Sequence, residues 1–107
     1  MIELAVRAIV EPRRRDILRL IQEVELPAGG IAAHFDVTRP AISQHLKVLT
    51  IAGLVTVRKE GTRRMYRARP EGLAELKSFL EEFWGDRLQA LAEVAEAEER
   101  RSKANGG

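Results

Sequence analysis

The stretch that most constrains the fold is TRPAISQHLKVLTIAG, residues 38–53, which predicts a short capped helix. Thr38 is a good N-cap, because its hydroxyl can accept a hydrogen bond from an amide that the first turn leaves unpaired. At 100° per residue, Ile42, Leu46 and Leu49 share a narrow stripe that must face a core. The opposite face is small, polar and basic, and it carries Arg39, Pro40, Ser43, Gln44 and Lys47. Gly53 predicts the C-terminal stop.

The length of 107 residues suits a single core. We expect one domain over residues 1–97, followed by a flexible charged tail over 98–107. The absence of cysteine excludes disulfides, thiolate metal sites and cysteine redox sensing. No apolar run approaches the roughly 20 residues that a membrane-spanning helix needs, and the N-terminus lacks a signal-peptide pattern. These features predict a cytoplasmic protein without a membrane partner.

The net charge of +2 conceals an uneven distribution along the chain. Residues 1–70 carry 13 Lys and Arg against 7 Asp and Glu, whereas residues 71–107 carry 5 against 9. A basic front part attracts polyanions and an acidic end is repelled by them. A small protein with an alternating charged surface can also divide this way, so charge alone leaves nucleic-acid binding open.

Two helices precede a helix-turn-helix pattern. Residues 2–10 predict a short apolar helix, and Pro12 begins a second helix that runs to about Val24. The cluster Arg13–Arg15 lies in the first turn of that helix, where cations oppose the helix dipole, so it is either tolerated on a solvated surface or kept by a bound anion. Pro27 and the pair Gly29–Gly30 interrupt the pattern, and a third helix with Ile31, Ala32 and Phe35 on one face follows. A two-residue turn then leads to Thr38, which is the helix-turn-helix arrangement.

After Gly53 the period changes from 3.6 to 2, and two β-compatible runs flank a loop that contains Gly61. We interpret this hairpin as a basic wing, able to reach the backbone or the minor groove of DNA; its cations are Arg58, Lys59, Arg63 and Arg64. The predicted fold is therefore mainly α with a small β-hairpin, a dimeric winged helix-turn-helix.

Pro70 begins a long helix with more apolar side chains than one small domain can bury. Together with the first helix, it predicts a homodimer packed across a two-fold axis. The expected interface residues are Ile2, Leu4, Val6, Ile9, Phe79, Leu80, Phe83, Trp84, Leu88 and Leu91. The alternative is that this helix merely covers its own domain.

Over its length up to about Glu93, the chain resembles the ArsR/SmtB family of winged-helix transcriptional repressors. The matching segments are EPRRRDILRLI, IAAHFDVTRPAISQHLKVLTIAGLVTVRKEG and RRMYRARPEGLAEL. The resemblance implies a homodimeric repressor that binds an imperfect palindrome in promoter DNA, its own promoter included, and that releases it when an inducer binds.

The chain departs from the family's metal sensors. Residues 25–31 lack the cysteine motif, and Leu88 stands where the other metal site has a histidine, although Asp86 is present. His34 and His45 have no second nitrogen or sulfur ligand at a helical spacing. The resemblance therefore implies the branch without a metal site, and we expect no metal and no cofactor.

If the helix enters the major groove, Arg39, Ser43 and Gln44 are the candidates for base edges. Phosphate contacts are expected from Thr38, Lys47, Arg14 and Arg15, with Arg63 and Arg64 anchoring the wing. An enzyme is disfavoured, since the sequence offers no catalytic pair and no Gly-rich phosphate loop. Two alternatives stay open: a winged helix used for architectural or protein contacts, and a regulator that senses a small apolar molecule near Phe79, Phe83 and Trp84.

Overall fold

A computed structural model describes residues 2–105, apart from the side chains of Asp86, Leu88 and residues 103–105. The chain divides into two units, residues 1–76 and residues 77–107, which we describe separately. The first unit contains helices α1 (Ile2–Val10), α2 (Pro12–Glu23), α3 (Ala28–Phe35) and α4 (Arg39–Ile51), and the beginning of α5 (Pro70–Asn105). Its strands are β1 (Leu26–Pro27), β2 (Val55–Glu60) and β3 (Arg63–Ala68).

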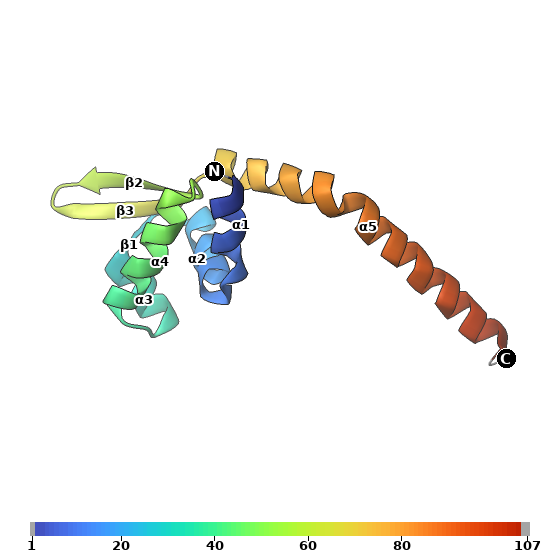
Figure 1. Ribbon diagram of the computed structural model, residues 1–107. Helices are drawn as coiled ribbons and strands as arrows, with labels where there is room; N and C mark the ends of the chain where they lie inside the picture. Colours follow the sequence, from blue (N-terminus) through green and yellow to red (C-terminus); the bar gives the residue numbers. More distant parts are fainter. Residues whose placement is uncertain (1, 106–107) are drawn as a thin grey trace. The chain divides into compact units, whose positions relative to one another are not determined.

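The core of the first unit is aliphatic. α1 lies beside α2 and α3 lies beside α4 (Figure 1), and their inward faces are buried together. The largest fully buried side chains are Ile17, Ile21, Ile31, Ile42, Leu46, Leu49 and Leu54. The stripe predicted for residues 38–53 is therefore confirmed as core, and α4 is held with its other face outward.

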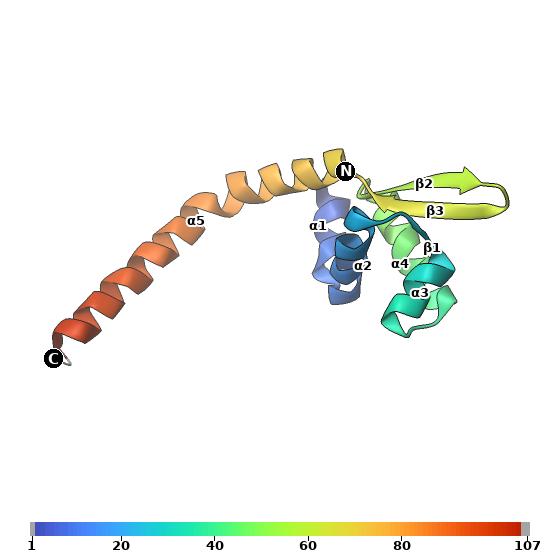
Figure 2. The ribbon, with the colours of Figure 1, turned by 180° about the vertical axis from the view of Figure 1, so that it is seen from behind.

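The three strands form an antiparallel sheet in the order β1-β3-β2, and the β2–β3 hairpin extends from the helices (Figure 2). Glu60 lies opposite Arg63 across the two-residue turn Gly61-Thr62, and Gly61 has a φ of 63°. A glycine with positive φ at the first central position matches the twist of the flanking strands. The predicted hairpin is confirmed, whereas β1 was not predicted, because two residues are too few to show a period.

One prediction about the third helix is wrong. Gly29 and Gly30 do not lie in a break before this helix; α3 begins at Ala28 and includes both. Pro27 occupies the N-cap position with extended backbone. A Cβ added at Gly30 would lie 3.5 Å from side-chain atoms of Leu26 and of Pro27. First-turn amides have no intrahelical partner in any helix, so glycine costs less there than in a helix interior.

The Arg13–Arg15 cluster has a use that the sequence analysis did not consider. Arg14 donates from Nε to the carbonyl of Ala8 at 2.6 Å, and Arg15 donates from Nη1 to the carbonyl of Ile9 at 2.7 Å. Both guanidinium groups thus meet the last carbonyls of α1, which carry the negative end of its dipole. The cations that oppose the dipole of α2 therefore stabilise the end of α1.

The backbone after α4 is packed tightly against the first turn of α5. Gly53 has a φ of 78°, as expected for the predicted stop. A Cβ added at Gly72 would lie 2.0 Å from the carbonyl oxygen of Gly53, and Arg69 donates to that same oxygen at 3.3 Å. Gly53, which lies between α4 and β2, is therefore in close backbone contact with Gly72 in the first turn of α5.

The second unit consists of α5 from Lys77 onward. Phe79 stacks on Phe83 with ring centroids 5.8 Å apart, and Phe83 meets Trp84 edge-on at 5.0 Å. Phe83, Trp84, Leu91 and Val94 are all more than two-fifths exposed. The helix continues through Asn105, and Ala, Glu and Arg dominate this stretch and favour helix. The domain boundary at residue 97 stays a prediction.

Candidate nucleic-acid interface

The sequence of α4 leaves one face of the helix open to solvent. The Thr38 hydroxyl accepts from the amide of Ala41 at 3.3 Å, which confirms the predicted N-cap, and Pro40 occupies the first turn, where it leaves no amide unpaired. The face opposite the buried stripe is exposed at every predicted contact: Thr38, Arg39, Pro40, Ser43, Gln44 and Lys47. This helix therefore presents short polar and basic side chains with nothing in its own unit covering them.

The turn before α4 fixes its direction relative to α3. Asp36 ends α3 in the left-handed conformation with a φ of 54°, and the amide of Val37 donates back to the carbonyl of Ala32 at 3.2 Å. Aspartate tolerates this conformation better than most residues. A helix, a tight left-handed turn and a capped helix are the helix-turn-helix that the sequence predicts.

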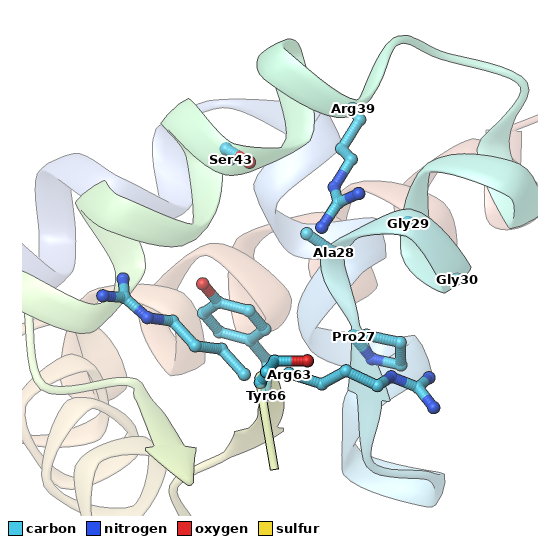
Figure 3. A pocket seen from close by; sticks show the side chains of 10 residues that line it. Pro27, Ala28, Gly29, Gly30, Arg39, Ser43, Arg63 and Tyr66 are labelled. Carbon is cyan, nitrogen blue, oxygen red and sulfur yellow. The ribbon is translucent and has the colours of Figure 1, made fainter. Parts of the chain in front are cut away.

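A groove of about 560 Å³ lies between the N-terminus of α3, the N-terminal half of α4 and the wing. Its lining residues are Pro27, Ala28, Gly29, Gly30, Arg39, Ser43, Thr62, Arg63, Arg64 and Tyr66. Figure 3 shows Arg39 extending from α4 towards Ala28, and the Tyr66 hydroxyl directed towards α4. Three cations from two elements line this groove together with the hydroxyls of Ser43, Thr62 and Tyr66.

The register of the hairpin assigns its cations to two faces. Lys59 lies opposite Arg64 and Val57 opposite Tyr66, so these four side chains share one face of the sheet. Arg58 and Glu60 alternate with them and lie on the other face. Arg64 and Tyr66 line the groove from the first face, Arg63 lines it although it lies opposite Glu60, and Arg58 is not among the lining residues.

Arg58 is engaged in ion pairs within the first unit. Its Nη2 and Nε form a two-point contact with the carboxylate of Glu25, the Nε–Oε2 distance being 3.2 Å, and Nη2 also lies 2.9 Å from Glu60. The hydrogen bond from Arg58 holds the pKa of Glu25 below its ordinary value, and the two carboxylates raise the pKa of Arg58. This guanidinium therefore stays charged and already has partners.

The structure brings some of the predicted contact residues together and separates others. Arg39, Ser43, Arg63 and Arg64 line the groove, and the remaining α4 candidates occupy the same exposed helix. Arg14 and Arg15 donate to the carbonyls of α1, and Arg58 is paired with Glu25 and Glu60, so these three have partners that the sequence did not predict. Tyr66 also lines the groove and was not among the predicted residues, although a lone tyrosine in a basic hairpin is a usable signal.

His45 is partly buried on the flank of α4. Burial lowers its pKa, and the positive charge of Arg14 lowers it further. The charged groups that act on it, Arg14, Glu11 and Arg13, lie at the start of α2. No group of three or more His, Asp or Glu side chains suited to a metal ion occurs within residues 2–105 whose side chains are described, and no helix there is long and apolar enough to cross a membrane.

A capped helix open to solvent, a left-handed turn before it and a basic hairpin beside it define a winged helix-turn-helix DNA-binding protein. The family model described as "Bacterial regulatory protein, arsR family" matches residues 11–57. The chain is also 42% identical, over 92 residues that make up 86% of each protein, to the HTH-type transcriptional regulator Rv2034 of Mycobacterium tuberculosis. The chain belongs to the ArsR family, a family of DNA-binding transcription regulators rather than enzymes.

Solved structures agree with this assignment. A crystal structure of a "possible transcriptional regulator for arsenical resistance" is 46% identical with a TM-score of 0.74, covering 82% of this chain and 92% of that one. A solution NMR structure from Mycobacterium bovis is 30% identical with a TM-score of 0.65, covering 80% of each chain. It is described as a homodimeric winged helix-turn-helix DNA-binding domain. The predicted family, fold and function as a DNA-binding transcriptional regulator are confirmed.

Proposed function

We propose that this protein is a homodimeric repressor that binds an imperfect palindrome in promoter DNA, with the region upstream of its own gene as the first candidate. In this proposal α4 enters the major groove. Arg39, Ser43 and Gln44 contact base edges, because Arg pairs well with guanine and Gln with adenine. Thr38 and Lys47 contact the phosphates that flank those bases.

The observation that carries the proposal is the groove between α3, α4 and the wing. Arg39, Arg63 and Arg64 line it, and the hydroxyls of Ser43 and Tyr66 add neutral donors. A cationic, donor-rich groove of this kind suits a phosphate backbone passing between the recognition helix and the wing. Pro27 provides no side-chain cap for α3, so the first amides of that helix add further donors at the rim.

Lys59 and Arg64 lie on one face of the wing, and we assign them, with Arg63, to the DNA backbone. Arg14, Arg15 and Arg58 are left out of this contact set. Some donors of each guanidinium group already bind carbonyls or carboxylates, and moving these groups to phosphates would break those contacts.

The homodimer would form through α1 and α5. Leu4 is 44% exposed on α1, and Phe83 and Trp84 are exposed on α5. Both helices therefore carry exposed apolar surface of the kind that protein–protein interfaces bury. A cavity of about 280 Å³ on α5, lined by Phe79, Glu82 and Phe83, could accommodate a side chain of the partner. The homodimeric relative from Mycobacterium bovis supports this assembly. A two-fold axis would place two α4 helices about 34 Å apart and would make the operator a palindrome.

Repression would follow from occupancy, since a dimer that covers a promoter excludes RNA polymerase. The test begins with selection of bound duplexes from a random DNA pool, and the enriched site is then compared with the promoter region. Recovery of a two-fold symmetric site is expected. A monomer that enriches no sequence over competitor DNA at moderate salt would contradict the proposal.

Two substitutions separate base reading from backbone contact. Gln44→Ala should reduce discrimination among operator variants by about 1 to 3 kcal/mol per lost contact. Arg64→Ala should weaken all duplexes alike and should reduce the salt dependence of binding by about one ion. Arg19→Ala is a matched control, because it removes an exposed cation of α2 that pairs with Asp16 outside the groove. If Gln44→Ala lowers affinity for every sequence equally, the assignment of base reading to that residue is wrong.

A further inference from the structure

The ion-pair cluster Glu25–Arg58–Glu60 joins parts of the first unit that are distant in sequence. Glu25 lies between α2 and β1, and Arg58 and Glu60 belong to β2. Arg58 contacts the Glu25 carboxylate at two points, in the fork arrangement that fixes the orientation of both groups. Glu25 is the less exposed partner, its side chain being 26% accessible against 54% for Arg58.

This contact crosses the whole sheet. The strand order is β1-β3-β2, so β2 is an outer strand whose backbone is paired only with β3. Arg58 lies opposite Met65 of β3, and Met65 lies opposite Pro27 of β1. The Arg58 side chain therefore passes over the central strand to reach Glu25, two residues before Pro27. We call this Arg58–Glu25 contact the tie, because it joins one edge of the sheet to the other.

A wing needs such a tie, because a two-stranded ribbon is marginal in water. All side chains of β2 from Thr56 to Glu60 are exposed, so burial of apolar area does little to hold this strand. The tie lies on the face of the sheet opposite Lys59 and Arg64. It can hold the ribbon without occupying the face that carries Lys59 and Arg64, whereas Arg63, the third wing cation assigned to DNA, lies opposite Glu60 on the face of the tie.

We propose that Glu25 is a positioning residue for DNA binding: through Arg58 it holds the wing so that Lys59 and Arg64 meet the phosphate backbone. This inference rests on the proposed function. Its consequence runs against simple electrostatics. Removing an acidic side chain from a protein that binds a polyanion should strengthen binding, whereas removing Glu25 weakens it, because the wing loses its tie.

The first experiment measures affinity for a mixed-sequence duplex, since the wing contact is independent of base sequence. Glu25→Gln should bind about two- to fivefold more weakly than the wild type, the range expected of a solvent-accessible ion pair. Its salt dependence should also become shallower, as fewer wing cations then displace counterions. Glu23→Gln is the matched control, because it removes the same charge from the exposed end of α2, and it should bind as tightly as the wild type or more tightly.

A double-mutant comparison separates a tie from a direct contact by Arg58. Adding Glu25→Gln to Arg58→Gln should produce no further loss of affinity, since either change alone breaks the pair. If Arg58 itself bound a phosphate and the pair held nothing in place, Arg58→Gln would weaken binding while Glu25→Gln left it unchanged or strengthened it. That outcome, or an affinity of Glu25→Gln equal to or above the wild type, overturns the proposal.

The second experiment needs no DNA, so it distinguishes failure of this inference from failure of the proposed function. Amide hydrogen exchange of the free protein should be faster in β2 and β3 for Glu25→Gln and unchanged there for Glu23→Gln, with the exchange of α4 equal in both. Unchanged exchange of the hairpin in Glu25→Gln shows that the pair does not hold the wing and overturns the proposal even if the protein binds DNA.

Discussion

Substitution of Gly72 by alanine tests the close backbone contact between the end of α4 and the first turn of α5. A Cβ at this position would lie 2.0 Å from the carbonyl oxygen of Gly53 and 3.0 Å from its carbonyl carbon. Contacts shorter than 3.0 Å are essentially never seen for a Cβ, so the two backbones must separate by about 1 Å. Neither can yield easily, because Arg69 binds the Gly53 oxygen by its side chain and the Leu54 carbonyl by its amide.

The magnitude follows from two opposing effects. Forcing extra volume into a packed site costs about 1 to 3 kcal/mol, and the upper end applies where backbone meets backbone. Replacing a helical glycine by alanine stabilises the folded state by about 0.5 to 1 kcal/mol, which offsets part of this cost. We therefore expect Gly72→Ala to lower the free energy of unfolding by about 2 kcal/mol, which corresponds to a fall in Tm of about 8 to 16 °C for a unit of this size.

The assay is thermal unfolding followed by far-ultraviolet circular dichroism, with all variants at one protein concentration because assembly shifts the apparent stability. Gly29→Ala is the control within the same unit, since nothing lies within 4 Å of a Cβ added there. It should keep or raise the Tm, because alanine restricts the unfolded chain. A Tm for Gly72→Ala equal to or above that of the wild type would refute the packing argument.

Three further outcomes are expected. Thr38→Ala removes the hydroxyl that caps α4 and should cost about 1 kcal/mol in urea unfolding, whereas Thr38→Ser should cost much less; equal losses would point away from the cap. Burial, and secondarily Arg14, lowers the pKa of His45, so the folded state should lose stability as the pH falls from about 6.5 towards that lowered pKa and no further below it. His45→Gln should flatten this part of a stability–pH curve measured by urea unfolding, and an unchanged curve would assign the dependence to other groups. Phe83→Glu should dissociate the proposed dimer in sedimentation experiments while Lys77→Glu leaves it intact, and a dimer that survives Phe83→Glu would move the interface away from the α5 aromatic residues.

Local features of the chain were predicted correctly because their causes are local. The Thr38 cap and the alternation of the β2–β3 hairpin depend on residues within a few positions of one another. The stripe of Ile42, Leu46 and Leu49 follows from the helical period alone. These same features identify the exposed face of α4, so the helix proposed to read DNA could be found without a structure.

The charged residues were harder to assign, because a cation in a sequence does not show which anion it meets. Arg14 and Arg15 looked available for phosphates, yet the fold brings the carbonyl end of α1 to them. Arg58 looked like one more wing cation, yet the register of the sheet brings Glu25 within its reach. In each case the partner comes from another part of the chain.

The sequence by itself determined the order of the helices, the core stripe of α4 and the basic character of the wing, since each depends on periodicity and composition over a short stretch. Only the tertiary structure decided which arginines bind carbonyls or carboxylates of the protein itself. It also placed the backbones of Gly53 and Gly72 in contact. The physical reason is that hydrogen bonds, ion pairs and steric contacts act over a few ångströms in space, and separation along the chain does not encode those distances.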